Sequence, residues 1–104
     1  MKLTLVVLAG GLLAAGAAQA QDAMALLTKY GCTACHAIDK KVVGPAYNEV
    51  AAKYKGDAGA AAKLAAKVKA GGTGVWGQVP MPPNPTVTEG DMKTMIAYIL
   101  ALKK

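Results

Sequence analysis

The sequence predicts an all-α domain of four short helices arranged around a bulky non-protein group. Apolar residues recur at helical spacing in four segments, and no segment has a clear strand pattern. The chain contains no Phe, one Trp and four Tyr, so it lacks the large side chains that usually fill a core of this size. A domain this short buries only about 60% of its unfolded surface. Either the domain is weakly stable, or a bulky non-protein group completes its interior.

Residues 1–20 have the layout of a secretory signal. Lys2 precedes an apolar run, and the run ends in a cleavage-like triplet of small residues around Gln19 that finishes at Ala20. A membrane anchor would need about 20 well-packed apolar residues, whereas this run is shorter and rich in Gly and Ala. The sequence therefore predicts export, cleavage after Ala20, no membrane anchor after cleavage, and one mature domain at 21–104.

The first two helices are predicted at residues 23–30 and 46–54. Asp22 can cap the first helix and Gly31 can end it, so this helix delivers the chain directly to the first cysteine. Pro45 suits a first-turn position and is predicted to open the second helix. A lysine-rich loop connects the two.

The last two helices are predicted at residues 58–70 and 92–104. Asp57 can cap the alanine-rich third helix, which has high intrinsic helix propensity. Thr88, with Asp91 three residues later, resembles a capping box before the fourth helix. Five residues of the fourth helix fall along one predicted apolar face: Met92, Met95, Ile96, Ile99 and Leu102.

Residues 71–87 are predicted to form a long loop. The segment carries four of the five prolines and several glycines, which argues against both a helix and a central strand. Long loops in compact domains are usually functional. Burial of Trp76 would give this loop an anchor.

The stretch GCTACHAI, residues 31–38, holds both cysteines and the single histidine of the chain: Cys32, Cys35 and His36. A thioredoxin-like dithiol needs a sheet of βαβ units, which this chain does not offer. A disulfide here would close a loop too short to stabilise the chain appreciably. A zinc site needs four ligands, and with no further Cys or His it would have to use Asp39 or a water.

The remaining interpretation is that Cys32 and Cys35 form thioethers to haem while His36 binds the iron from one side. Two sulfurs three positions apart lie on the same face of a helical turn, and the next side chain can reach under the ring that they hold. The predicted export supports this interpretation, because c-type haem is attached outside the bacterial cytoplasm.

A second axial ligand would decide between electron transfer and chemistry on a bound ligand. The mature chain offers four methionine sulfurs, at Met24, Met81, Met92 and Met95. Core packing is the better explanation for Met24, Met92 and Met95. Met81 differs, because it lies in the stretch VPMPPN, where prolines hold the backbone extended. A thioether on a stiffened loop suits a preorganised ligand, although Met81 could also fill a gap beneath the loop.

The stretches GCTACHAID, VGPAY, GVWG, PMPPN and MIAYILALKK resemble the class I cytochromes c, specifically the short single-haem bacterial type. The resemblance covers the whole mature chain in order. It implies the cytochrome c fold, one covalently attached haem c, and axial ligation by His36 and Met81. It also implies a periplasmic electron carrier that serves nitrite reductases or terminal oxidases and receives electrons from an upstream cytochrome, with no substrate chemistry of its own.

The resemblance further implies roles around the haem. The carbonyl of Pro45 would accept the second ring N–H of His36, Trp76 would donate to a haem propionate, and Asn84 would bond near the Met81 sulfur. Each has a plainer alternative: Pro45 as a helix starter, Trp76 as a core anchor and Asn84 as a turn residue.

Three further positions bear on the haem pocket. Lys67 falls where relatives often have a basic residue near a propionate, although a solvated helix lysine would look the same. The chain departs from the family pattern at Tyr54, where Phe is frequent, and at Tyr98, where many relatives carry Trp.

The charge of the mature chain points to a protein partner. Loss of Lys2 leaves 11 lysines against 6 acidic residues and no arginine. Nucleic-acid recognition relies on bidentate arginines, so no nucleic-acid partner is predicted. The lysines either steer an acidic redox partner to an exposed haem edge, from positions such as Lys29, Lys40, Lys41 and Lys69, or merely keep the protein soluble. A monomer is the default for a carrier that must dock and leave.

Two alternative functions stay open at this point. One is a haem enzyme or gas-binding protein in which Met81 does not reach the iron, and the other is an exported dithiol module without haem.

Overall fold

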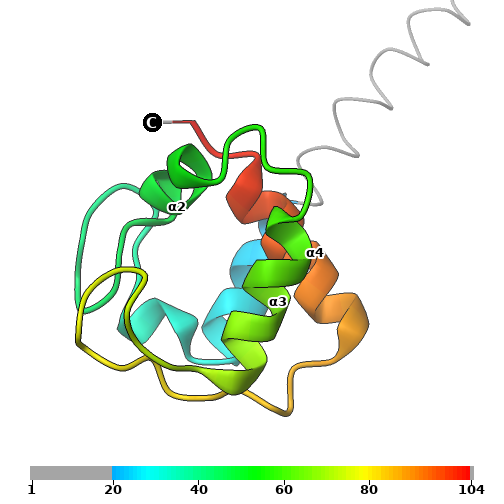
Figure 1. Cartoon of the computed structure of the whole chain (residues 1–104). Coiled ribbons are helices and arrows are strands. Elements are labelled where there is room, and N and C mark those ends of the chain that lie inside the picture. The colour runs from blue at the N-terminus through cyan, green and yellow to red at the C-terminus, as the bar shows by residue number, and fades with distance from the viewer. Residues whose placement is uncertain (1–19, 104) are drawn as a thin grey trace, which may run out of the picture.

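Helices enclose the interior of the domain on several sides (Figure 1). The computed structural model describes residues 20–103. An N-terminal helix at 20–29 leads into the 3-10 turn η1 (Cys32–Ala34), followed by α2 (Tyr47–Lys53), α3 (Ala60–Ala70) and α4 (Glu89–Leu100). Within this described part, extended pairing is limited to two isolated bridges, so the all-α prediction is confirmed.

Helix α4 is the centre of the packing, because it contacts both α2 and α3. The Tyr30 hydroxyl donates to the Asp91 carboxylate at 2.6 Å and ties the end of the N-terminal helix to α4. The buried hydrophobic cluster draws on three helices and the segment before α4; it comprises Leu27, Tyr47, Val50, Val87, Met92, Met95, Ile96 and Ile99. Four of the five residues predicted on the inner face of α4 are therefore buried.

The N-cap of α4 is predicted correctly, whereas the helix begins at Glu89 rather than 92 and also ends earlier than predicted. Thr88 is the N-cap, and its Oγ1 accepts from the Asp91 N–H at 3.2 Å. The Asp91 carboxylate accepts the Tyr30 hydroxyl rather than completing a capping box. The helix stops at Leu100 instead of continuing to 104; beyond it Ala101 and Lys103 are exposed, and Leu102 packs partly buried against the core.

Two predicted helix starts are wrong. Asp22 lies inside the N-terminal helix, which already includes residues 20 and 21, so it is not the cap. Pro45 precedes α2 rather than opening it: Ala46 is the N-cap. The backbone N–H of Tyr47 bonds the carbonyl of Ala37 at 2.9 Å, and this long-range tie sets where α2 begins.

Helix α3 starts two residues later than predicted. Gly59 occupies the N-cap position, and the Asp57 carboxylate accepts from the Gly59 N–H and from Lys63 Nζ, both at 2.8 Å. The hydrogen bond from Lys63 lowers the pKa of Asp57 below its ordinary value. Asp57 thus organises the turn before the helix and does not cap it directly.

None of the helices in residues 20–103 is long and apolar enough to cross a membrane. The predicted signal peptide lies outside the described residues apart from its last position, so its cleavage after Ala20 stays a prediction.

Candidate haem-binding site

A cavity enclosed by the helices and the long loop gathers most of the predicted site residues. Residues from η1, α2, α3, α4 and the loops contribute to its lining. Six of the seven predicted site residues line it: Cys32, Cys35, His36, Pro45, Trp76 and Met81. The chain therefore brings the CxxCH motif, near one end of the sequence, to the same cavity as the proline-rich loop.

The two cysteines lie at the start and just after the end of η1. Gly31 precedes this turn with a φ of 76°, a conformation that glycine adopts without strain. The backbone N–H of His36 bonds the Cys32 carbonyl at 3.1 Å, which keeps the motif in one tight turn. Both cysteines are partly buried free thiols, and burial raises the pKa of Cys32 above its ordinary value. The Cys32 thiol is therefore neutral at physiological pH.

The imidazole of His36 is held by its Nδ1 atom, which lies 2.8 Å from the Pro45 carbonyl oxygen. A carbonyl can only accept, so Nδ1 carries the proton and Nε2 keeps a free lone pair. Because Pro45 lies outside α2, its carbonyl is available to His36. A hydrogen bond of this kind fixes the tautomer and orientation of a metal-binding imidazole.

Two neighbours further restrict the His36 ring. The Tyr47 ring stacks on it with centroids 4.9 Å apart and planes inclined by 16°. The backbone of Gly44 approaches from nearby, since a Cβ at this position would come within 2.5 Å of His36 Cε1. Burial raises the pKa of Tyr47 well above its ordinary value, so the stacked phenol stays neutral. The ring of His36 is thus prepositioned by three residues of one short segment.

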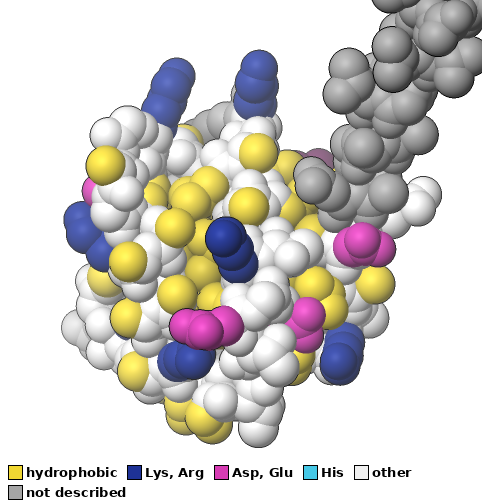
Figure 2. Space-filling model, turned by 90° about the vertical axis from the view of Figure 1, so that its right-hand side faces the viewer, with side chains coloured by type: hydrophobic (Ala, Val, Ile, Leu, Met, Phe, Trp, Pro, Cys, Tyr) yellow, Lys and Arg dark blue, Asp and Glu magenta, His cyan; other side chains and the backbone are white. Residues whose placement is uncertain are grey.

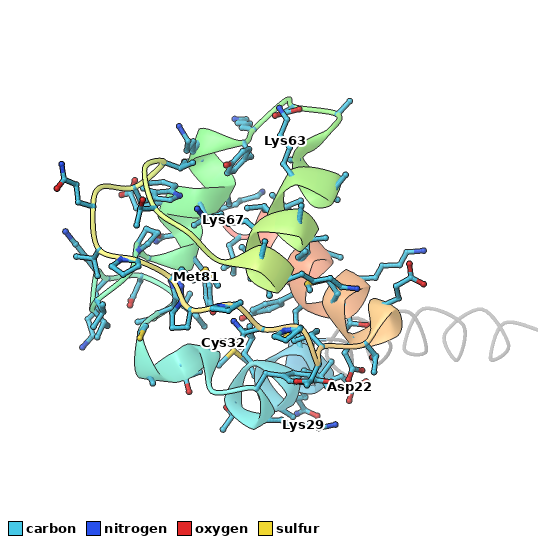
Figure 3. All side chains as sticks on the ribbon, turned by 60° about the horizontal axis from the view of Figure 1, so that its bottom comes forward. Asp22, Lys29, Cys32, Lys63, Lys67 and Met81 are labelled. Atoms are coloured by element: carbon cyan, nitrogen blue, oxygen red, sulfur yellow. The ribbon has the colours of Figure 1, made fainter. Side chains whose placement is uncertain are left out.

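Met81 reaches the cavity from the loop that follows α3, whereas Cys32 comes from the N-terminal part of the chain (Figure 3). An antiparallel bridge joins Met81 to Gly72. Lys67 of α3, labelled in the same view, also lines the cavity. The loop predicted between 71 and 87 is therefore ordered around Met81.

Trp76 lines the cavity and Asn84 does not, while the predicted donation of Trp76 to a haem propionate stays a prediction. Trp76 borders the cavity but is 42% exposed, and Lys53 Nζ lies 5.7 Å from the centroid of its ring. Asn84 is not among the lining residues; its Nδ2 donates to the Pro82 carbonyl at 3.1 Å. This hydrogen bond fits the plainer role of Asn84 as a turn residue, and its bond near the Met81 sulfur stays a prediction.

Exposed apolar side chains surround the mouth of the cavity. Among its lining residues, Val43, Val75, Trp76 and Val79 are 42% to 66% exposed. Lys41 lines the cavity and Lys40 is exposed beside it. On the face shown in Figure 2, by contrast, basic side chains are dispersed among acidic and apolar ones. An apolar edge with adjoining lysines is thus a feature of the cavity mouth.

The residues around the cavity fit a covalently attached haem. Two thiols and an imidazole with one free ring nitrogen come from one turn, soft thioethers come from Met81 on the loop and from Met92 and Met95 on α4, and most of the lining is apolar. Within residues 20–103, no three His, Cys, Asp or Glu side chains gather into a metal site of their own. The donor set matches an iron porphyrin with His and Met ligands better than a bare metal ion.

Sequence reasoning missed three residues that shape this site. Tyr47 and Gly44 position the His36 ring, and Gly72 pairs with Met81. In the sequence, the GPAY motif contains Gly44 and Tyr47, and the two consecutive glycines after the third helix include Gly72. Periodicity alone could not show which distant residue each one meets.

Comparison with known proteins identifies relatives over most of the chain. The family model described as cytochrome c matches residues 14–103. Cytochrome c-551 of Pseudomonas aeruginosa is 51% identical over 96 residues, covering 92% of this chain and 91% of that protein. Cytochrome c-552 of Nitrosomonas europaea is 50% identical over 95 residues, covering 91% and 90%.

A solved structure also resembles this fold. The crystal structure of wild-type Nitrosomonas europaea cytochrome c552 superimposes with a TM-score of 0.73 at 50% identity and covers 77% of this chain and 99% of that one.

Proposed function

Because the chain belongs to the cytochrome c family of single-haem electron carriers, we propose that it carries electrons through a haem held by Cys32 and Cys35, with His36 and Met81 as axial ligands. The carrier function, the fold and the single covalently attached haem c follow from family membership. The observation that best supports the four residue roles is the convergence of the CxxCH turn and Met81 on one cavity.

Each residue has a distinct role in this proposal. The haem iron supplies the redox chemistry by alternating between ferrous and ferric states. Cys32 and Cys35 hold the group through thioethers, and His36 offers Nε2 because Nδ1 is bonded to Pro45. The Met81 sulfur favours the ferrous state and so raises the reduction potential. With both axial positions filled, no site is left for a substrate, which argues for a carrier and against an enzyme.

The ferric spectrum tests the axial assignment. The holoprotein should show the weak near-infrared band of Met sulfur bound to ferric haem, and Met81→Ala should remove it completely while Met24→Ala leaves it intact. Met24 is a suitable control because it packs against the core cluster rather than lining the cavity. A native protein without the band, or one whose reduced form binds carbon monoxide rapidly, would instead support an open-site haem protein.

The location and the partners are further parts of the proposal. The signal-like residues 1–20 support export to the periplasm, where a respiratory reductase or oxidase could accept the electron and an upstream cytochrome could donate it. We infer that the partner docks at the cavity mouth, where exposed Val43 lies beside Lys40 and Lys41 and exposed Val79 lines the same cavity. These lysines would favour an acidic partner surface.

Ionic strength should change the rate of electron exchange in a direction set by the charge of the reagent. Oxidation of the reduced protein by anionic hexacyanoferrate(III) should slow as salt is added, whereas oxidation by a cationic cobalt tris-phenanthroline complex should become faster. Stopped-flow absorbance at the haem bands measures both rates.

Two double variants that remove the same charge from different places test whether the salt dependence arises at the cavity mouth. Lys40→Ala/Lys41→Ala should weaken the salt dependence with hexacyanoferrate more than Lys55→Ala/Lys93→Ala, which removes the same charge from exposed positions outside the cavity lining. Equal effects of the two pairs would mean that net charge, and not this surface, guides the reagent.

A further inference from the structure

Two paired glycines at the end of α3 make the closest backbone contacts to Met81. Gly72 N–H donates to the Met81 carbonyl and Met81 N–H donates to the Gly72 carbonyl, both at 2.9 Å. This reciprocal pair fixes the backbone of Met81 in position and direction. It closes an excursion of exposed residues, 73–80, most of which line the cavity near its mouth.

Gly71 lies directly against the backbone on the other side of Met81. A Cβ at Gly71 would overlap the Met81 carbonyl oxygen and would come within 2.8 Å of Pro83 N and 2.9 Å of Pro82 C. All three atoms belong to main chain, and prolines restrict the bending of this segment. The contact therefore exists only because residue 71 has no side chain.

The chain after Met81 is tied to the same helix. Asn84 N–H donates to the Val68 carbonyl at 2.9 Å, two residues before the end of α3. Gly72 and Val68 thus hold the segment on both sides of the thioether. The other glycines of the excursion differ, since a Cβ on Gly74 or Gly77 would meet open space.

We propose that Gly71 and Gly72 form a backbone clamp that positions Met81 for the iron. The clamp fixes the position of the Met81 thioether relative to α3. The exposed residues 73–80 can therefore move without moving Met81. Gly72 supplies the hydrogen bonds and Gly71 supplies the close approach. Both are positioning residues, and the inference rests on the proposed axial role of Met81.

Gly71→Ala should loosen the axial bond, with Gly56→Ala as its control. Both glycines have positive φ, 68° and 80°, so both variants carry backbone strain. Only Gly71→Ala also collides with the Met81 segment, because nothing lies within 4 Å of a Cβ at Gly56. We expect Gly71→Ala to lose more than half of the near-infrared Met band of the ferric holoprotein, and Gly56→Ala to keep it.

Added imidazole gives a second readout, because it competes with Met81 for the ferric iron. The affinity of the ferric protein for imidazole should rise about tenfold in Gly71→Ala and stay unchanged in Gly56→Ala. Only at Gly71 does the added methyl group overpack against main chain and so weaken the bond from Met81 to the iron. If the two variants retain the band and bind imidazole equally, the clamp does not position Met81. A wild-type protein without the band would refute the axial assignment itself, which separates the two failures.

Amide hydrogen exchange of the wild-type holoprotein tests the clamp even if Gly71→Ala fails to fold. The amides of Gly72, Met81 and Asn84 should be protected well beyond that of Val75, because each is bonded across to another segment. Exchange of Gly72 and Met81 as fast as Val75 would overturn the proposal.

Discussion

Replacing Cys32 and Cys35 together by Ala should abolish covalent haem attachment completely. Both thiols lie in the η1 turn beside His36 and border the same cavity, and the chain contains no other cysteine. No alternative thioether can therefore form. Cys32→Ala or Cys35→Ala alone should leave one thioether and a shifted haem spectrum.

Loss of the haem should also prevent stable folding of the double variant. The cavity is lined by buried residues of α2 and α4, including Val50, Met95 and Ile96. A haem in the cavity would therefore pack against these residues and complete the core of this small domain. With few aromatic side chains the remaining packing is insufficient for a domain of this size. Far-ultraviolet circular dichroism should show a large loss of helix.

The measurement is haem staining of the denatured protein on a gel, after expression with the haem-attachment machinery. Thr33→Ala is the matched control, because Thr33 is an exposed residue of the same turn and should stain as the wild type does. Staining of the double variant would contradict the proposed role of the cysteines, and full helix content without haem would contradict the proposal that haem completes the core.

The helices were predictable because their information is local. Apolar spacing placed Met92, Met95, Ile96 and Ile99 on the inner face of α4, and Thr88 marked its start. Likewise the CxxCH spacing needed only one turn of chain to bring its three side chains together. Patterns of this kind depend on residues that are neighbours in sequence.

The remaining features depend on contacts between distant segments. Nothing near Pro45 shows that Tyr47 bonds Ala37 and so delays the start of α2. The pairing of Gly72 with Met81 spans the whole excursion, and the sequence predicts only that a loop is present. Burial of Trp76 would give the loop an anchor, yet the loop carries Trp76 to the mouth of the cavity, where its side chain is 42% exposed.

Leu27→Ala should lower the stability of the holoprotein by about 3 kcal/mol, the range found for leucine truncation in a packed core. Leu27 is 2% exposed and is the largest fully buried side chain among residues 20–103. It joins the N-terminal helix to the core cluster and also borders the haem cavity. Removal of three carbons therefore leaves a void that neither the helix nor the cavity surface can fill.

Thermal or guanidinium unfolding of both proteins in one redox state measures the loss, which should lower the melting temperature by roughly 10 °C or more. Leu26→Ala is the matched control, since Leu26 is its neighbour on the same helix but only partly buried, and its cost should be about 1 kcal/mol. The near-infrared Met band should persist in both variants, because Leu27 takes no part in the backbone hydrogen bonds between Met81 and Gly72. Equal destabilisation by the two substitutions would show that the N-terminal helix is not anchored through Leu27.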